Sequence, residues 1–271
     1  MTPIQALRRG AARRVELVPM TPLEQLRAGR LVHRVSQLLV GLVLFGISMA
    51  LLLRADLGLE PWGVLQYGLI QHIPMSYGAM SIVVSFVVLL LWIPLRQWPG
   101  LGTVLNAVVI GVAIDATLAV VPTIEGLGWR VAVMLLAIVG NGVAGAMYIG
   151  SQLGPGARDG LMTGLARRTG RSIRLVRTSI EVTVVVLGFA LGGIVGVGTV
   201  LYALLIGHVV QLFLPRLTVR VERPAPRGSG TPAAIAPGTE TPAPATAPAA
   251  AAASAVDGER EGQDARGAGL A

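Results

Sequence analysis

The stretch GTVLNAVVIG (residues 102–111) returns almost unchanged as GTVLYALLIG (residues 198–207). Seven of the ten positions are identical, and the shift between the two copies is 96 residues. At the same shift, the Leu-Gly pair at residues 57–58 matches the Leu-Gly pair at residues 153–154. Matches in separate places at one shift, without a gap, indicate an internal duplication.

The composition is that of a membrane protein. Of the 271 residues, 53% are hydrophobic and only 13% are charged, and the mean hydropathy is +0.69. A soluble domain carries about a quarter charged residues, so this chain has too little polar surface to dissolve. Cysteine is absent, which excludes disulfides, thiolate metal sites and a cysteine nucleophile.

The basic residues point to a membrane and not to nucleic acid. The formal net charge is +8, and all the basic residues other than histidine are arginine. These arginines flank apolar runs, so we expect them to orient the chain in a bilayer, with no nucleic-acid partner. The arginine-rich stretch 167–177 is expected to face anionic lipid headgroups.

Six apolar runs are each near the roughly 20 residues that a helix needs to cross the hydrocarbon core. They predict an all-α polytopic membrane protein with six transmembrane helices. Arginine-rich and arginine-poor links alternate along the chain, which predicts that both termini are cytoplasmic. The runs are residues 37–53, 76–95, 101–121, 131–149, 179–196 and 197–214.

The chain is expected to have four parts. Residues 1–34 are a basic cytoplasmic arm, residues 35–121 the first membrane repeat, and residues 122–216 the second. Residues 217–271 are rich in proline and alanine and have almost no large apolar residue beyond their first few positions. Such a segment cannot bury enough surface to become ordered, so we expect a disordered cytoplasmic tail.

Three spans per copy is an odd number, so the second copy must cross the membrane in the opposite sense to the first. Many secondary transporters are built from such inverted repeats, with broken helices near the repeat interface that bind the substrate. The alternative is that duplication only produced a stable bundle, because fold alone does not determine function.

Two glycine- and proline-containing loops, residues 55–69 and 151–165, are candidate sites because irregular backbone at an apolar helix end needs protein or water partners. Pro61 suits the first turn of a short helix, and Trp62 is expected to anchor at the membrane interface or to stack on a substrate. Asp159 is expected to cap a helix that begins at Gly160. Arg158 either contacts a lipid phosphate or binds an anionic solute.

Polar residues inside the spans are the other candidates, because charge within a membrane is costly. Arg177 and Glu181 are four residues apart and so share one helix face, as a structural ion pair or a functional one. Asp115 has no basic neighbour in sequence and either relays a proton, binds a cation or makes an interhelical hydrogen bond. Asn106 and Asn141 complete the set.

Several function classes find no support in the sequence. No metal-site spacing, P-loop, dinucleotide fingerprint or nucleophile elbow is present;. We therefore expect neither a cofactor nor a resident metal, and no enzymatic activity. The formation of an oligomer stays open.

Three segments also resemble a known family. LGLEPWGVLQYGL (residues 57–69), GTVLNAVVIGVAID (residues 102–115) and LGPGARDGLMTGLARRTGRSIRLVRTSIE (residues 153–181) are similar to the bacterial YczE/YyaS/YitT-type integral membrane proteins. The resemblance covers about residues 35–215, and RDGLM with the downstream Arg and Glu is its most specific part. It implies a multi-pass protein of the bacterial inner membrane without a firmly assigned activity.

The resemblance implies that several residues of this chain occupy motif positions of the family. The chain departs from the family pattern at His208, where a proline is expected after the last Ile-Gly. The motif positions are Pro61, Trp62, Arg158, Asp159, Gly160, Arg177 and Glu181.

The leading hypothesis is a transporter or permease-like protein for an unknown small solute, coupled to a cation or proton through Asp115. The alternative is a non-transporting membrane factor that supports another membrane-associated protein. A third hypothesis, a lipid-modifying enzyme, needs an activated acid or base at Arg158 and Asp159. A polar cavity between the repeats would distinguish the transporter from the accessory factor.

Overall fold

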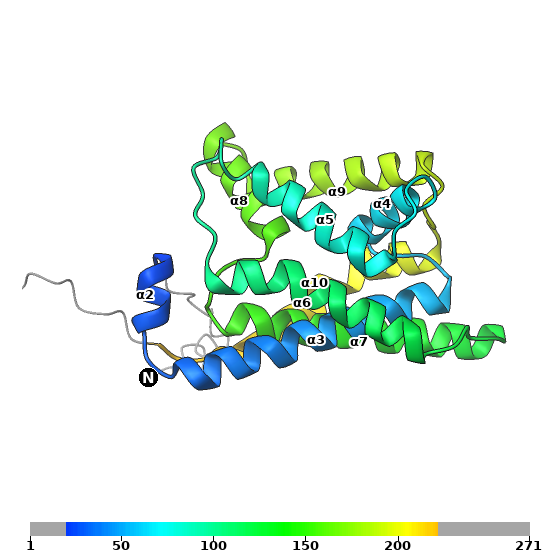
Figure 1. The fold of residues 1–271 in the computed structure, drawn as a ribbon, viewed down its shortest axis with the longest axis horizontal. Helices are drawn as coiled ribbons and strands as arrows, with labels where there is room; N and C mark the ends of the chain where they lie inside the picture. The colour runs from blue at the N-terminus through cyan, green and yellow to red at the C-terminus, as the bar shows by residue number, and fades with distance from the viewer. Residues whose placement is uncertain (1–19, 222–271) are drawn as a thin grey trace, which may run out of the picture. The chain divides into compact units, whose positions relative to one another are not determined.

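The computed structural model describes residues 20–221, which are helical and contain no strand (Figure 1). The predicted tail beyond residue 221 and the first 19 residues of the basic arm lie outside this range. The helices are α2 (Pro22–Arg27), α3 (Leu31–Ala55), α4 (Pro61–Ile70), α5 (Tyr77–Leu90), α6 (Leu101–Val120), α7 (Leu127–Gly150), α8 (Ala157–Thr169), α9 (Ile173–Ala190) and α10 (Val197–Leu217).

Four helices are long and apolar enough to cross a membrane by length and composition: α3, α6, α7 and α10. The helix α5 is apolar but has only 14 residues, and the chain then continues in turns as far as Arg96. The helix α9 has 18 residues, but Arg174, Arg177 and Glu181 lie in its first half. The structure is thus an all-helical membrane protein.

Some predicted boundaries shift because of helix capping. The helix α9 begins at Ile173, six residues before the predicted run, because the Ser172 side chain accepts from the Leu175 amide and caps it;. It also ends earlier, where Gly192 adopts a φ of +89°. The helix α3 also begins earlier than predicted, at Leu31 and without a side-chain cap, so Arg34 belongs to a membrane helix and not to the arm.

The helices repeat with the same 96-residue spacing as the sequence. Counterpart helices begin at Leu31 and Leu127, Pro61 and Ala157, Tyr77 and Ile173, and Leu101 and Val197. The turns repeat as well, because Asp56 and Gln152 have φ angles of 48° and 54°, while Gly58 and Gly154 have φ angles of 120° and 121°. The two halves therefore share one order of elements.

The helices α3 and α7 pack side by side and antiparallel at the centre, and arginine contacts join their ends. Near the start of α3, the fully buried Arg34 donates to the carbonyls of Ser151 (2.8 Å) and Gln152 (2.6 Å) at the end of α7. Near the start of α7, Arg130 donates to the carbonyls of Ala55 (2.7 Å) and Asp56 at the end of α3. Each arginine thus satisfies carbonyls that the other half's helix leaves free at its C-terminus.

The shorter helices are exchanged between the halves. The helix α4 packs mainly on α9 of the other half, and α8 packs on α5 of the other half as well as on its own neighbour α9. The loops do the same, since the Gly198 amide donates to the Leu57 carbonyl and the Gly102 amide to the Leu153 carbonyl, both at 2.8 Å. Figure 1 shows α4 and α8 at opposite ends of the helix bundle.

The two halves differ in one respect. The helix α5 packs along α6, whereas α9 has no comparable contact with α10. Between α5 and α6, Asp115 accepts hydrogen bonds from Ser76 Oγ (2.5 Å) and from the Gly78 amide (2.8 Å). No such bond joins Gln211 to Ser172, the counterparts in the described second half.

Candidate functional site

A cavity of about 250 Å³ lies where the helices α3 to α10 converge. Its wall combines apolar side chains with polar ones, although four of the surrounding helices, α3, α6, α7 and α10, are strongly apolar. The N-termini of the short helices α4 and α8 both open onto it. The charged and polar lining residues are Glu60, Arg158, Asp159, Arg177, Glu181, Asn106, Asn141, Gln211, Tyr148, Tyr202, Ser81 and Ser85.

Many lining residues are counterparts in the two halves, which places the cavity where equivalent surfaces meet. In these pairs the first half supplies mainly neutral residues, while the second half supplies most of the charges. The pairs are Phe45 and Asn141, Glu60 and Gly156, Trp62 and Arg158, Ser81 and Arg177, Ser85 and Glu181, Asn106 and Tyr202, and Ile110 and Ile206.

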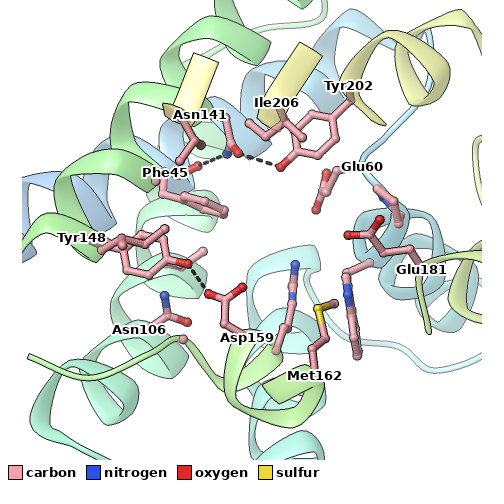
Figure 2. A pocket seen from close by; sticks show the side chains of 18 of the residues that line it. Phe45, Glu60, Asn106, Asn141, Tyr148, Asp159, Met162, Glu181, Tyr202 and Ile206 are labelled. Carbon is pink, nitrogen blue, oxygen red and sulfur yellow. Dashed lines mark hydrogen bonds between the residues drawn. The ribbon is translucent and has the colours of Figure 1, made fainter. Parts of the chain in front are cut away.

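Glu60 is the N-cap residue of α4, but its side chain does not cap the helix. The residue is 2% exposed, and neither carboxylate oxygen has a hydrogen-bond partner among the described residues. Burial raises the pKa of Glu60 to about 7, although Arg158 and the backbone amides of Glu60 and Gly63 favour the charged form;. Figure 2 shows the carboxylate directed into the cavity.

Arg158 and Trp62 lie against each other at the first turns of α8 and α4. The guanidinium carbon is 5.1 Å from the centre of the indole ring, which is a cation–π contact;. Trp62 is only 7% exposed, so it is a buried wall residue and not the interfacial anchor expected from the sequence. Arg158 has no hydrogen bond to the described part of the chain, and it lines the cavity.

The other charged residues of the cavity have partners. Arg177 Nε lies 2.9 Å from Glu181 Oε1, so the pair expected from their spacing is present on α9. The carboxylate of Asp159 accepts from the hydroxyl of Tyr148. Asp159 is not an N-cap as expected, because α8 begins at Ala157 and Asp159 lies in its first turn.

The two predicted asparagines lie on the wall contributed by the long helices. Asn141 is 1% exposed and accepts from the Tyr202 hydroxyl at 2.8 Å (Figure 2). Its amide nitrogen lies 3.5 Å from the Phe45 carbonyl. Asn106 lines the cavity near Asp159.

Two motif positions have structural roles. Pro61 is the first residue of α4. Gly160 lies against the buried indole of Trp92, where a Cβ would lie 2.0 Å from a ring carbon. Trp92 is itself held in place, since its Nε1 donates to the Ala157 carbonyl at 2.9 Å. Gly160 therefore positions α8 through close packing.

Asp115 does not line the cavity. Its carboxylate lies at the N-terminus of α5, where it accepts from Ser76 and Gly78. Its counterpart Gln211 does line the cavity. The proposed site of proton or cation coupling is therefore spatially separate from the cavity charges.

The comparisons connect the chain with one protein family and with proteins of two bacteria. Residues 32–215 match DUF6198, a family of unknown function. The chain belongs to this family. An uncharacterized protein of Haemophilus influenzae is 42% identical over 180 residues, which cover 66% of this chain and 83% of that protein.

Two relatives come from Bacillus subtilis. The uncharacterized membrane protein YczE is 34% identical over 173 residues, 64% of this chain and 80% of the relative. The uncharacterized protein YyaS is 25% identical over 180 residues, 65% of this chain and 90% of the relative. These relatives agree with the family resemblance found from the sequence motifs. No solved structure matches the chain.

Sequence reasoning missed some residues of the site. Glu60 stands directly before Pro61 in the candidate loop 55–69, but the sequence pattern does not single it out from that loop. A lone acid at the N-cap of a short apolar helix is the signal that could have revealed it. Tyr148 and Tyr202 carry no sequence signal, because tyrosine is common in apolar helices near membranes.

Proposed function

We propose that this protein is a transporter for a small polar solute in the bacterial plasma membrane. The observation that carries the proposal is the cavity: five charged side chains gather inside a bundle whose four long helices are apolar. Charged groups are costly in a membrane interior, and in transporters they mark solute and ion pathways. A purely structural bundle gains nothing from such a cavity.

The proposal includes six membrane spans. We count α5 and α9 as spans, beside the four long helices, because each runs from one end of the bundle to the other. At one end, Arg168 in α8 donates to the Pro94 carbonyl beyond α5, at 2.5 Å. At the other end, His72 beyond α4 contacts the Leu191 carbonyl at the end of α9, at 3.2 Å.

The outer faces of α5 and α9 support the same assignment. Large apolar side chains on both helices are exposed, as expected of surfaces that face lipid. On α9, Val186 and Phe189 are 59% and 65% exposed, and on α5 Leu90 is 63% exposed.

The proposal further treats the two halves as inverted repeats. The helices α3 and α7, which are counterparts, run antiparallel, and the arginine contacts at their ends are exchanged between the halves. A two-fold axis that relates equivalent contacts in this way makes an isologous interface. An axis in the membrane plane is the arrangement of many secondary transporters.

The distribution of arginine supports cytoplasmic termini. Among the described residues, only Arg54 and Arg130 lie at the end of the bundle where α3 finishes, and Arg130 pairs with Asp56 at 2.7 Å. The opposite end carries most of the cations, which agrees with the positive-inside rule and suits anionic headgroups. Those cations are Arg27, Arg30, Arg34, Arg96, Arg167, Arg168, Arg171, Arg174, Arg216 and Arg220.

The two halves differ in how α5 packs on α6 and α9 on α10, and this difference supports a route for the solute into the cavity. The α5–α6 side is closed by the Asp115 hydrogen bonds, while α9 and α10 are not packed together. In an inverted repeat, each half can adopt the conformation of the other, and this exchange opens the cavity to the opposite side of the membrane. We therefore propose that closing α9 on α10 accompanies opening of α5 from α6.

Transport can be tested in vesicles that contain the full chain. We expect uptake of at least one solute from a panel of amino acids, sugars, organic acids and amines under an imposed ion gradient. Gly207 lines the cavity and has open space at its Cβ position. We expect Gly207→Leu to fill the cavity and slow uptake at least about tenfold without preventing folding.

Gly128→Leu is the matched control, because Gly128 also has open space at its Cβ position but lies at the start of α7, outside the cavity. It is expected to keep the uptake rate. Failure of every solute to move under any gradient would leave the non-transporting accessory role as the better hypothesis.

A further inference from the structure

Two charged side chains at the cavity have opposite signs and no hydrogen bond within the described chain. Glu60 has two unpartnered oxygens and is 2% exposed. The guanidinium of Arg158 lies over the face of Trp62 and has no hydrogen bond or ion pair among the described residues. The two residues interact electrostatically, but they are too far apart to form an ion pair with each other.

The remaining charges of the cavity do not offer comparable sites. Arg177 and Glu181 neutralise each other at 2.9 Å. Asp159 already accepts a hydrogen bond from Tyr148. A solute that enters the cavity therefore meets one carboxylate and one guanidinium that have no hydrogen bond to the described chain.

We propose that the cavity binds a small zwitterion, with its amine beside Glu60 and its carboxylate beside Arg158. The proposal rests on the transport function and specifies its substrate class. A simple cation would leave Arg158 without a partner, and a simple anion would leave Glu60 without one. Leaving one partner of a buried charge pair unsatisfied is costly, so the solute with both charges is favoured.

The geometry of Arg158 suits a carboxylate. Its guanidinium carbon lies over the ring of Trp62, 5.1 Å from the ring centre, and its N–H groups have no hydrogen bond within the described chain. Such a fork matches the two oxygens of a carboxylate. The cavity of about 250 Å³ is slightly below the range of about 300–1,000 Å³ typical of drug-sized ligands, so we expect a compact solute.

The proposal can be tested with three probes that share a four-carbon chain. They are L-2-aminobutanoate, which is zwitterionic, butan-1-amine, which is cationic, and butanoate, which is anionic. Binding to the full chain in lipid nanodiscs is measured by calorimetry at pH 8, where Glu60 is ionised. We expect the zwitterion to bind at least about tenfold more tightly than either single-charge probe.

Two variants locate the binding. Glu60→Gln and Arg158→Gln are each expected to weaken binding of L-2-aminobutanoate at least about tenfold. Glu125→Gln and Arg171→Gln, which make the same chemical changes at exposed positions, are expected to leave it unchanged. If a variant fails to fold, the native chain still provides a test, because its affinity for the zwitterion should rise between pH 6 and pH 8.

Other results would overturn the proposal. They are equal affinity for the amine or for butanoate, no binding of any probe, or a zwitterion affinity that does not change with pH. Binding of the zwitterion without its movement in vesicles would instead reject transport and keep the substrate class. Uptake of an uncharged sugar without zwitterion binding would reject the substrate class and keep transport.

Discussion

At the scale of single residues, the cavity is notable for Glu60. The carboxyl group lies in the connection before α4, is buried, and has no hydrogen-bond partner in the described structure. Most buried polar groups in proteins are hydrogen-bonded. Ionisation of a buried carboxyl group without a hydrogen-bond partner lowers the free energy of unfolding. Such a cost is expected of a group that serves binding and not folding.

This cost gives a prediction about pH. The pKa of Glu60 is raised from 4.5 to about 7, so between these values the folded chain holds a proton that the unfolded chain has lost. Stability should therefore fall as pH rises from about 5 to about 7.5, by roughly 3 kcal/mol in all. Thermal unfolding in detergent across this range measures the effect.

The Glu60→Gln variant supplies the comparison, since an amide cannot ionise. We expect its unfolding temperature to change less over the same pH range than that of the native chain. Glu125→Gln, at an exposed position, should follow the native profile. A Glu60→Gln profile that matches the native one would show that Glu60 does not carry a raised pKa.

The sequence allowed part of the site to be predicted at this scale. Arg158, Arg177 and Glu181 stand out because charge is rare in an apolar chain, and all three line the cavity. The partners of these residues depend on packing between distant helices. The contact of Arg158 with Trp62 joins residues 96 apart, which no local pattern reveals.

At the scale of helices, close packing of α4 on α9 holds the wall of the cavity. A Cβ on Gly188 would lie 2.5 Å from the backbone nitrogen of Leu65, which cannot move away cheaply. We expect Gly188→Ala to lower the free energy of unfolding by about 1–3 kcal/mol, as measured by denaturation in detergent.

Gly128→Ala is the matched control, because its Cβ would meet open space within α7. There the gain in helix propensity should leave stability unchanged or raise it by about 0.5–1 kcal/mol. Equal effects of the two substitutions would contradict the packing role of Gly188.

The hydrogen bonds of Asp115 give a prediction about movement of helices. If Asp115 keeps α5 closed on α6, then Gln211→Asp places an acid at the equivalent position of α10, where it could bind the second-half N-cap, Ser172, once α9 closes on α10. We expect this substitution to bring α9 closer to α10. Spin labels on cysteines introduced at Ile173 and Leu212, both exposed, report the distance in a chain that has no other cysteine.

Gln211→Asn serves as the control because its side chain has the length of aspartate without the charge. It should leave the distribution of distances near the native one. Identical distributions for the aspartate and asparagine variants would argue against a latch that depends on the carboxylate.

Helix boundaries could be predicted only in part. The helices α3, α6, α7 and α10 follow from their long apolar runs. The start of α9 could not be predicted in this way, because its first turns carry arginines and its beginning depends on the cap at Ser172. Hydropathy detects the membrane interior, whereas capping determines where a helix begins.

At the scale of the whole molecule, six spans and four spans predict different exposures of the links. Single cysteines at Ile73 and Trp98 lie on either side of α5, and at Arg171 and Val195 on either side of α9. A thiol reagent that does not cross membranes should label residues 73 and 195 in intact cells. Residues 98 and 171 should react only after the membrane is opened.

Labelling of residues 73 and 98 from the same side would show that α5 does not cross the membrane. Reaction of residue 171 in intact cells would reverse the proposed orientation. Each outcome bears on the inverted repeat, which requires three crossings in each half.

The exchanged arginine contacts determine where the molecule can move. Arg34 and Arg130 hold α3 and α7 together at both ends through buried or half-buried hydrogen bonds. Sliding of one central helix along the other would break both sets of bonds at once, so this pair forms a fixed frame. Any motion that admits or releases a solute must therefore come from the peripheral helices, which swing against a centre that stays still.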